Sequence, residues 1–142
     1  MKTVVCALVL TALLTGCDKA PIESSEPTPE FLAEGLKVYT QNCLTCHMAD
    51  GGGVPHMQPA LDGSPSVSGD PTTLIRMLIQ GPNKVLPANR PHFSATMPSF
   101  SSKLSDEEIA AVLTYIRQEY GNHASMIKVQ KVTTIHNQFG GG

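Results

Sequence analysis

Two cysteines and a histidine in the first half of the chain have the spacing of a covalent cofactor site. Cys43 and Cys46 are separated by two residues, and His47 follows directly. Each cysteine sulfur can add to one of the two vinyl groups of haem, and the adjacent imidazole then falls beneath the ring centre as an iron ligand. The Cys-x-x-Cys-His pattern therefore predicts a c-type haem attachment site with His47 as the proximal ligand.

A Cys-x-x-Cys pair by itself also occurs in thioredoxin-like redox sites and in zinc sites. A zinc site would need further cysteine or histidine ligands at knuckle spacing, and the other cysteines, Cys6 and Cys17, lie far upstream. A thioredoxin-like pair would follow a strand, whereas the residues before Cys43 have a helical pattern. The sequence therefore favours haem attachment over both alternatives.

The N-terminus resembles a bacterial lipoprotein signal. Lys2 precedes an apolar run at 4–14, which is too short to span a bilayer, because a spanning helix needs about 20 apolar residues. The run ends in Leu-Thr-Gly-Cys, which resembles a lipobox with cleavage before Cys17. By this resemblance, residues 1–16 are a signal peptide, and a lipid on Cys17 anchors the protein on the periplasmic side of a membrane. An ordinary secretory signal or an uncleaved anchor is the alternative.

The rest of the chain divides into a tether, one small domain and an extension. Residues 17–28 are rich in Pro, Ser and Glu, and such a stretch buries too little apolar surface to fold, so it predicts a flexible tether. Residues 29–122 have the size of one small domain. Residues 123–142 form a C-terminal extension that we expect to be partly disordered, with 126–135 extended on the surface or loose.

Three helices are predicted at 29–42, 71–80 and 105–120. Thr28 and Asp70 are N-cap residues directly followed by proline, and Ser105 begins a capping-box pattern. The apolar residues recur at the helical period; in the first and third helices they are Phe31, Leu32, Leu36, Tyr39, Ile109, Val112, Leu113 and Ile116. Loops are expected at 49–69 and 82–103. The fold class is therefore all-α, with about three to four helices and long loops around one haem.

Further motifs, in the same order, resemble class I c-type cytochromes over 29–122. Gly35 and Tyr39 resemble the family's first helix, in which a small residue and an aromatic residue cross the last helix. Val112 and Tyr115 resemble the partner face of that last helix. The resemblance implies a small monohaem cytochrome c fold. In its details the chain is most similar to cytochromes that serve periplasmic quinoprotein dehydrogenases or respiratory oxidases.

The same resemblance implies the remaining haem contacts. The segment Pro-Ala-Leu-Asp-Gly at 59–63 resembles the family's Pro-x-Leu-x-Gly, in which the carbonyl of Pro59 would accept a hydrogen bond from the free ring nitrogen of His47. Leu61 would pack on the haem face. Thr-Met-Pro at 96–98 resembles the distal segment, so the thioether of Met97 would be the second iron ligand and would raise the reduction potential.

Other residues compete with Met97. Met48 is too close to His47 to reach the opposite haem face, Met77 lies in a helical apolar stripe, and Met57 is expected to contact haem without ligating it. His92 is the main rival, and a bis-histidine site would have a lower potential. We expect His92, like the other histidines outside the motif, to be solvated.

The haem propionates also need partners. Mitochondrial-type members of the family use a tryptophan, and this chain has none. Arg90, Arg76 or the loop amides after Gly81 must take this role, and the sequence does not choose among them.

These features predict a membrane-tethered periplasmic electron carrier with one covalently attached haem c. It would not be an enzyme, and it would exchange electrons with a donor and an acceptor such as a dehydrogenase, oxidase or reductase. The net charge of −2 argues against a nucleic-acid partner. The alternatives are a haem enzyme or gas sensor with an open distal site, and a fixed electron-entry subunit of a larger complex.

Overall fold

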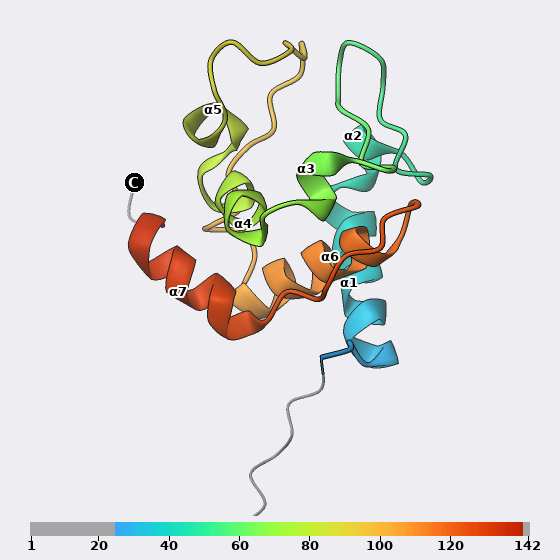
Figure 1. The fold of residues 1–142 in the computed structure, drawn as a ribbon, viewed down its shortest axis with the longest axis vertical. Helices are drawn as coiled ribbons and strands as arrows, with labels where there is room; N and C mark the ends of the chain where they lie inside the picture. Colours follow the sequence, from blue (N-terminus) through green and yellow to red (C-terminus); the bar gives the residue numbers. More distant parts are fainter. Residues whose placement is uncertain (1–24, 141–142) are drawn as a thin grey trace, which may run out of the picture.

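The computed structural model describes residues 25–140, in which all regular structure is helical apart from an isolated bridge between Val54 and Gln58 (Figure 1). Seven helical segments follow one another: α1 (Pro29–Asn42), α2 (Leu44–His47), α3 (Pro65–Ser68), α4 (Pro71–Gln80), α5 (Pro82–Val85), α6 (Asp106–Gln118) and α7 (Val129–Phe139). Four of them are longer helices, and α2, α3 and α5 have 4 residues each. This architecture confirms the all-α prediction. The predicted signal peptide, Cys17 and the first part of the tether lie outside the described residues.

The first and third predicted helices correspond to α1 and α6, which cross each other (Figure 1). The Thr28 side chain accepts a hydrogen bond from the Phe31 amide at 3.2 Å, and Ser105 and Glu108 form the predicted capping box. The crossing is close, because a Cβ at Gly35 would lie 2.4 Å from the Ala111 carbonyl oxygen. Only glycine permits this approach of the two backbones.

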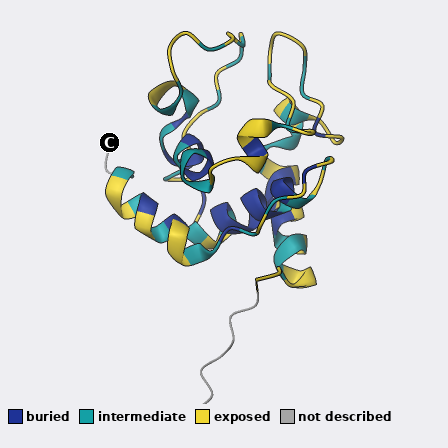
Figure 2. Cartoon of the chain, in the orientation of Figure 1, coloured by how far each residue is buried: buried dark blue, intermediate teal, exposed yellow. Residues whose placement is uncertain are grey.

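The hydrophobic core lies where the longer helices face one another, and Figure 2 shows it as buried faces on α1, α4 and α6. α4 begins as predicted, because the Asp70 carboxylate accepts hydrogen bonds from the Thr72 and Thr73 amides. The expected apolar stripe of α6 is buried. On α1, by contrast, the prediction for Leu36 was wrong: this side chain is 47% exposed, and Val38 is buried instead.

The C-terminal extension folds differently from the expectation. Residues 129–139 form α7, which packs on α4 and α6 through the buried side chains Val132 and Ile135. Helix propensity alone would not predict it, because valine, threonine and isoleucine are common in this stretch. The tertiary contacts with α4 and α6 stabilise the helix. Gly141 and Gly142, at the expected disordered end, lie outside the described residues.

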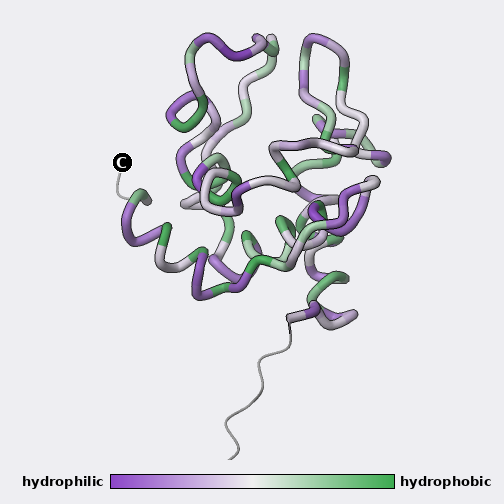
Figure 3. Tube along the Cα trace, in the orientation of Figure 1, coloured by the Kyte–Doolittle hydropathy of each residue, from purple (hydrophilic) through white to green (hydrophobic). Residues whose placement is uncertain are grey.

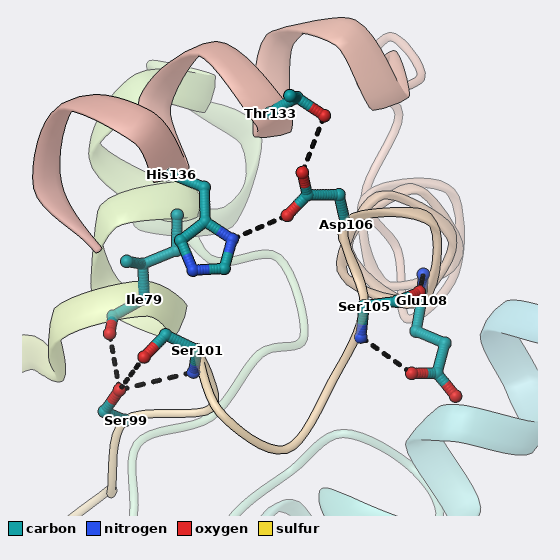
Figure 4. A network of polar contacts seen from close by, with 8 residues as sticks. All are labelled: Ile79, Ser99, Ser101, Ser105, Asp106, Glu108, Thr133 and His136. Carbon is teal, nitrogen blue, oxygen red and sulfur yellow. Dashed lines mark hydrogen bonds and ion pairs between the residues drawn. The ribbon is translucent and has the colours of Figure 1, made fainter. Parts of the chain in front are cut away.

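Polar contacts fasten α7 to the start of α6 (Figure 4). The Asp106 carboxylate accepts a hydrogen bond from Thr133 Oγ1 and another from His136 Nδ1, both at 2.6 Å. His136 was expected to be solvated, and its partner could not be seen in the sequence because 30 residues separate the two. Arg76 of α4 adds a cation–π contact, with its guanidinium carbon 4.3 Å from the Phe139 ring centroid.

Two long loops project from the same end of the molecule (Figure 1). One follows α2, and the other follows α5; the short α3 and α5 lie within the regions predicted as loops, each with proline at its first turn. The loops meet through backbone hydrogen bonds from the Ser94 amide to His56 and from the Ala95 amide to Met57. Within residues 25–140, none of the helices has the length and apolar character needed to cross a bilayer.

Candidate functional site

The short helix α2 carries Cys46 and His47 of the Cys-x-x-Cys-His motif, and Cys43 lies directly before it. Cys43 ends α1, where its amide donates to the Tyr39 carbonyl at 2.8 Å, and it is also the N-cap of α2. One turn of helix brings Cys43 and Cys46 to the same face, because side chains three residues apart are neighbours on a helix. Neither cysteine forms a disulfide. Both sulfurs are thus presented together, one turn apart, with His47 next to them.

The thiol of Cys43 is poorly suited to a thiolate site. Burial, together with the neighbouring Cys46, raises its pKa to about 11, and Lys103 offsets this only in part. Redox-active and zinc-binding cysteines work as thiolates and usually have a lowered pKa. Within residues 25–140, no group of three or more His, Cys, Asp or Glu side chains is arranged to hold a metal ion. The geometry thus gives no support to the zinc and thioredoxin-like alternatives.

His47 is oriented by the loop that follows it. Its Nδ1 lies 3.1 Å from the carbonyl oxygen of Pro59. A carbonyl can only accept, so Nδ1 carries the proton in this contact and Nε2 keeps a free lone pair. Burial lowers the pKa of His47 more than the Pro59 hydrogen bond raises it, which favours the neutral imidazole. A neutral ring with a free Nε2 and a fixed Nδ1–H is the form that binds a metal.

We call residues 43–63 the proximal segment. Its loop is compact: the Gly53 amide donates to the His47 carbonyl at 3.1 Å, and the Leu61 amide donates to the Gly51 carbonyl at 2.7 Å. Gly53 has φ of 65°, and a Cβ there would lie 2.6 Å from the Pro59 carbonyl oxygen. A glycine at this position is therefore required both by the backbone conformation and by the Pro59 carbonyl.

The proximal segment is also bound to the helices. Tyr39 of α1 donates its hydroxyl to the Met48 carbonyl at 2.6 Å. Its ring packs against Tyr115 and Tyr120, with centroid distances of 5.8 and 5.4 Å. Tyr120 in turn covers Gly51, where a Cβ would meet the ring at 2.6 Å. The sequence pattern indicated Tyr39 and Tyr115 as parts of a helix crossing, but it gave no signal for Tyr120.

We call residues 82–100 the distal segment, and it contains Met97. It is held at its C-terminal end against α4: the Phe100 amide donates to the Leu78 carbonyl at 2.8 Å, and the Ser99 hydroxyl donates to the Ile79 carbonyl (Figure 4). Met97 is half-buried and packs against the hydrophobic core. Its side chain is therefore neither fully buried in the core nor fully exposed to solvent.

The competing residues lie elsewhere. Met77 is 8% exposed within the α4 core, as expected for a packing residue. Met48 and Met57 are exposed and belong to the proximal segment itself. His56 and His92 are exposed on the two loops. Met97 therefore remains the predicted distal ligand, and nothing in the arrangement of the other candidates points to one of them.

The donor set and its surroundings fit a c-type haem. Two thiols, one imidazole nitrogen and one thioether are the groups that attach and ligate it. Partly buried apolar side chains border the core from both segments, as a large apolar ring requires: Leu44 and Leu61 from the proximal segment, and Val85, Leu86 and Met97 from the distal segment.

The comparisons with known proteins agree with this arrangement. The Cytochrome c family matches residues 32–119. The cytochrome c subunit of alcohol dehydrogenase (quinone) from Gluconobacter oxydans is 40% identical over 105 residues, which are 70% of this chain and 22% of that protein. The gluconate 2-dehydrogenase cytochrome c subunit from Pantoea cypripedii is 36% identical over 93 residues, which are 63% of this chain and 21% of that protein.

A shorter relative matches over most of its own length. Cytochrome c-552 from Thermus thermophilus is 35% identical over 94 residues, 63% of this chain and 70% of that protein. By contrast, the chain spans only about a fifth of the length of the dehydrogenase subunits, since the aligned share is 22% and 21%. Within this chain, the residues that match the family, 32–119, include the Cys-x-x-Cys-His motif.

Proposed function

We propose, from the premise that this chain belongs to the cytochrome c family, that it carries single electrons between protein partners on the periplasmic side of a bacterial membrane. The chain is an electron-transfer protein rather than an enzyme, and its cofactor is a covalently bound haem c. We also propose its iron ligands, a membrane tether, its location and its partners.

Each residue of the site has a distinct task in this proposal. Bound haem c supplies a reversible one-electron change at its iron. Cys43 and Cys46 hold the ring by thioether bonds, so that the cofactor does not dissociate. His47 binds through Nε2, and its hydrogen bond to Pro59 fixes the ring orientation and raises the basicity of the ligand. Met97 would provide a thioether ligand, which would stabilise the reduced state relative to a second histidine.

The observation that carries the proposal is the 3.1 Å contact between His47 Nδ1 and the Pro59 carbonyl, next to the two motif cysteines on α2. Such a contact leaves Nε2 as the free nitrogen and orients it without any contribution from the cofactor. The charge of the iron would change with each electron transferred. The Pro59 carbonyl suits such a ligand, because it can accept the Nδ1 proton of His47 in the oxidised and in the reduced state.

The partners are proposed from the relatives. Two of these are cytochrome c subunits of an alcohol dehydrogenase and of a gluconate dehydrogenase. We therefore expect a dehydrogenase or another respiratory protein as electron donor, and an oxidase or reductase as acceptor. Because relatives are subunits, a fixed place in a larger complex is the second candidate. Purification from the native membrane distinguishes them: stoichiometric partner chains support the subunit, and a monomer supports the mobile carrier.

The tether is proposed from the lipobox-like sequence that ends at Cys17 and from the polar stretch after it. Lipidation of Cys17 would keep the domain at the membrane, since two or more acyl chains anchor far better than one. Incorporation of labelled palmitate tests it: the wild type is expected to be labelled and to sediment with membranes, and Cys17→Ser to be unlabelled. Cys6→Ser is the matched control. Labelling of Cys17→Ser would contradict the proposal.

A redox titration followed by the optical spectrum tests the electron-transfer function. We expect reversible reduction that fits a single one-electron step, with the same spectrum after repeated cycles. Rapid binding of carbon monoxide by the reduced native protein would instead support the alternative of a haem enzyme or gas sensor, because such proteins need an open iron position.

A further inference from the structure

A haem brings two carboxylates into the protein, and this charge needs a partner. An ionised carboxylate that is partly buried without a cation or hydrogen-bond donors is costly. Arginine is the side chain best suited to a carboxylate, because its planar guanidinium offers paired donors and keeps its charge. The inference below rests on the proposed function, since it concerns the propionates of the same haem.

The chain has three arginines, and Arg117 of α6 is hydrogen-bonded inside the protein. Its side chain is among the buried groups, at 3% exposure. Nε donates to the Ser125 carbonyl at 2.9 Å, and Nη1 donates to the carbonyls of Val67 and Gly69 at 2.6 and 3.1 Å. Arg117 therefore ties α6 to α3 and to the chain after α6. It is a structural residue.

Arg76 of α4 points to the C-terminal helix. Its Nε donates to the Gln80 side chain at 3.1 Å, and its guanidinium carbon lies 4.3 Å from the centroid of the Phe139 ring of α7. The cation–π contact and the hydrogen bond together fix the side chain between α4 and α7. The side chain of Arg76 is thus used in the contact between α4 and α7.

Arg90 is placed differently, in the loop between α5 and Met97. It is half-buried and lines a cavity of about 240 Å³, whose other lining residues are Asn83, Leu86, Pro87, Ala88 and His92. Its Nη2 donates to the Asn83 side-chain oxygen. This contact fixes the guanidinium at the cavity wall and uses one of its five donor hydrogens, so the others can bind an anion.

The cavity wall lies in the distal segment, before Met97. Leu86 also packs against the hydrophobic core, as Met97 of the same segment and Leu61 of the proximal segment do. The tip of the loop is hydrophilic, as Figure 3 shows for the chain after α5. An apolar wall with a cation at its polar end matches a haem edge, where an apolar ring ends in carboxylates.

We propose that Arg90 binds a haem propionate and that Asn83 positions the Arg90 guanidinium for this contact. The positive charge keeps the propionate ionised and favours the reduced iron, because a nearby cation offsets the charge that the electron adds. Arg90 therefore raises the reduction potential.

The test compares Arg90→Gln with Arg76→Gln, which removes the same charge at the α7 contact. The reduction potential of each matured protein is measured against pH by spectroelectrochemical titration. We expect Arg90→Gln to have a lower reduction potential than the wild type. We also expect the fall in potential that accompanies propionate deprotonation to occur about one to three pH units higher than in the wild type. Arg76→Gln should match the wild type. His92→Gln, which removes the other titratable group on the wall, should keep the wild-type propionate step.

An unchanged potential and pH profile in Arg90→Gln, or equal shifts in both arginine variants, would overturn the assignment. If Arg90→Gln yields no stable protein, Arg90→Lys decides: retention of charge without paired donors should leave the potential near the wild type but change the propionate bending bands in the resonance Raman spectrum. Unchanged bands would overturn the proposal. The wild-type titration separately tests the proposed function, because a failure of one-electron cycling would appear there first.

Discussion

The proximal and distal segments border the same site, but the helices support them to different extents. The proximal segment is fastened along its length: Tyr39 binds the Met48 carbonyl, Asn122 donates to the Leu61 carbonyl at 2.9 Å, and the Gly63 amide donates to the Tyr120 carbonyl at 3.0 Å. The distal segment is hydrogen-bonded to α4 at its C-terminal end, while its middle contacts the other loop through Ser94 and Ala95. The helices thus hold the loop that orients His47 along its length, whereas they hold the loop that contains Met97 near Ser99 and Phe100.

The largest expected difference comes from removing each ligand in turn. His47→Gly should abolish the low-spin haem spectrum, because the imidazole oriented by Pro59 is lost. Met97→Ala should keep the covalently attached haem, lower the reduction potential sharply and allow carbon monoxide to bind. Spectra and potentials of the two matured variants provide the measurement. An unchanged potential in Met97→Ala would exclude Met97 as the ligand.

The second test concerns the proximal loop. Gly53→Ala introduces a Cβ that would lie 2.6 Å from the Pro59 carbonyl oxygen, at a φ of 65°. We expect a loss of about 2–4 kcal/mol, from backbone strain and overpacking together. Gly63→Ala is the matched control, since its φ is 54° and nothing lies within 4 Å of the added carbon. It should cost only the strain, about 1–2 kcal/mol. Equal losses in denaturant unfolding would argue against a special role for the Pro59 contact.

A smaller effect is expected where α1 holds the proximal segment. Tyr39→Phe removes the hydrogen bond to the Met48 carbonyl and should cost about 1 kcal/mol. Tyr115→Phe removes only the long 3.5 Å contact with the Tyr120 hydroxyl and should cost less. Unfolding free energies of both variants provide the measurement. A greater loss in Tyr115→Phe would show that the tyrosine cluster, rather than the Met48 contact, fastens the loop.

The smallest effect lies outside both segments, at the docking of α7. Partial burial raises the pKa of Asp106, but the hydrogen bonds from Thr133 and His136 outweigh this and lower it. A lowered pKa stabilises the folded state above the ordinary carboxyl pKa, and this contribution is lost as the pH falls through the lowered value. The wild type should therefore lose more stability in acid than Asp106→Asn.

Glu107→Gln is the control for this effect, because Glu107 lies in the same first turn of α6 but is exposed. It should lose stability in acid as the wild type does. Thermal unfolding between neutral and acidic pH, with the haem spectrum recorded in parallel, provides the measurement. Equal losses of stability in acid for the wild type and Asp106→Asn would contradict this account of the α7 contact.

The sequence predicted those features that depend on neighbouring residues. Thr28 and Asp70 define the starts of α1 and α4, and the bounds of both helices agree with the prediction. The helix α7 was missed because its β-branched residues give weak helix propensity and its partner Asp106 lies far away in the chain. Contacts between distant residues, such as Asn122 with Leu61, leave no pattern in a single sequence.

The functional site shows the same division between local features, which the sequence predicts, and contacts between distant residues, which it does not. The spacing of Cys43, Cys46 and His47 is local, so the motif predicts the attachment site directly. The choice among the arginines required the structure, because it depends on the partners of Arg76 and Arg117, which lie on other helices.

The optical spectrum of the protein matured with its haem tests the central claim most directly. It is recorded oxidised, then reduced, and finally with carbon monoxide. Ligation by His47 and Met97 predicts a low-spin spectrum with the weak far-red sulfur-to-iron band in the oxidised state, and no change on addition of carbon monoxide. A five-coordinate spectrum that shifts with carbon monoxide would contradict the account of an electron carrier and support an open distal site.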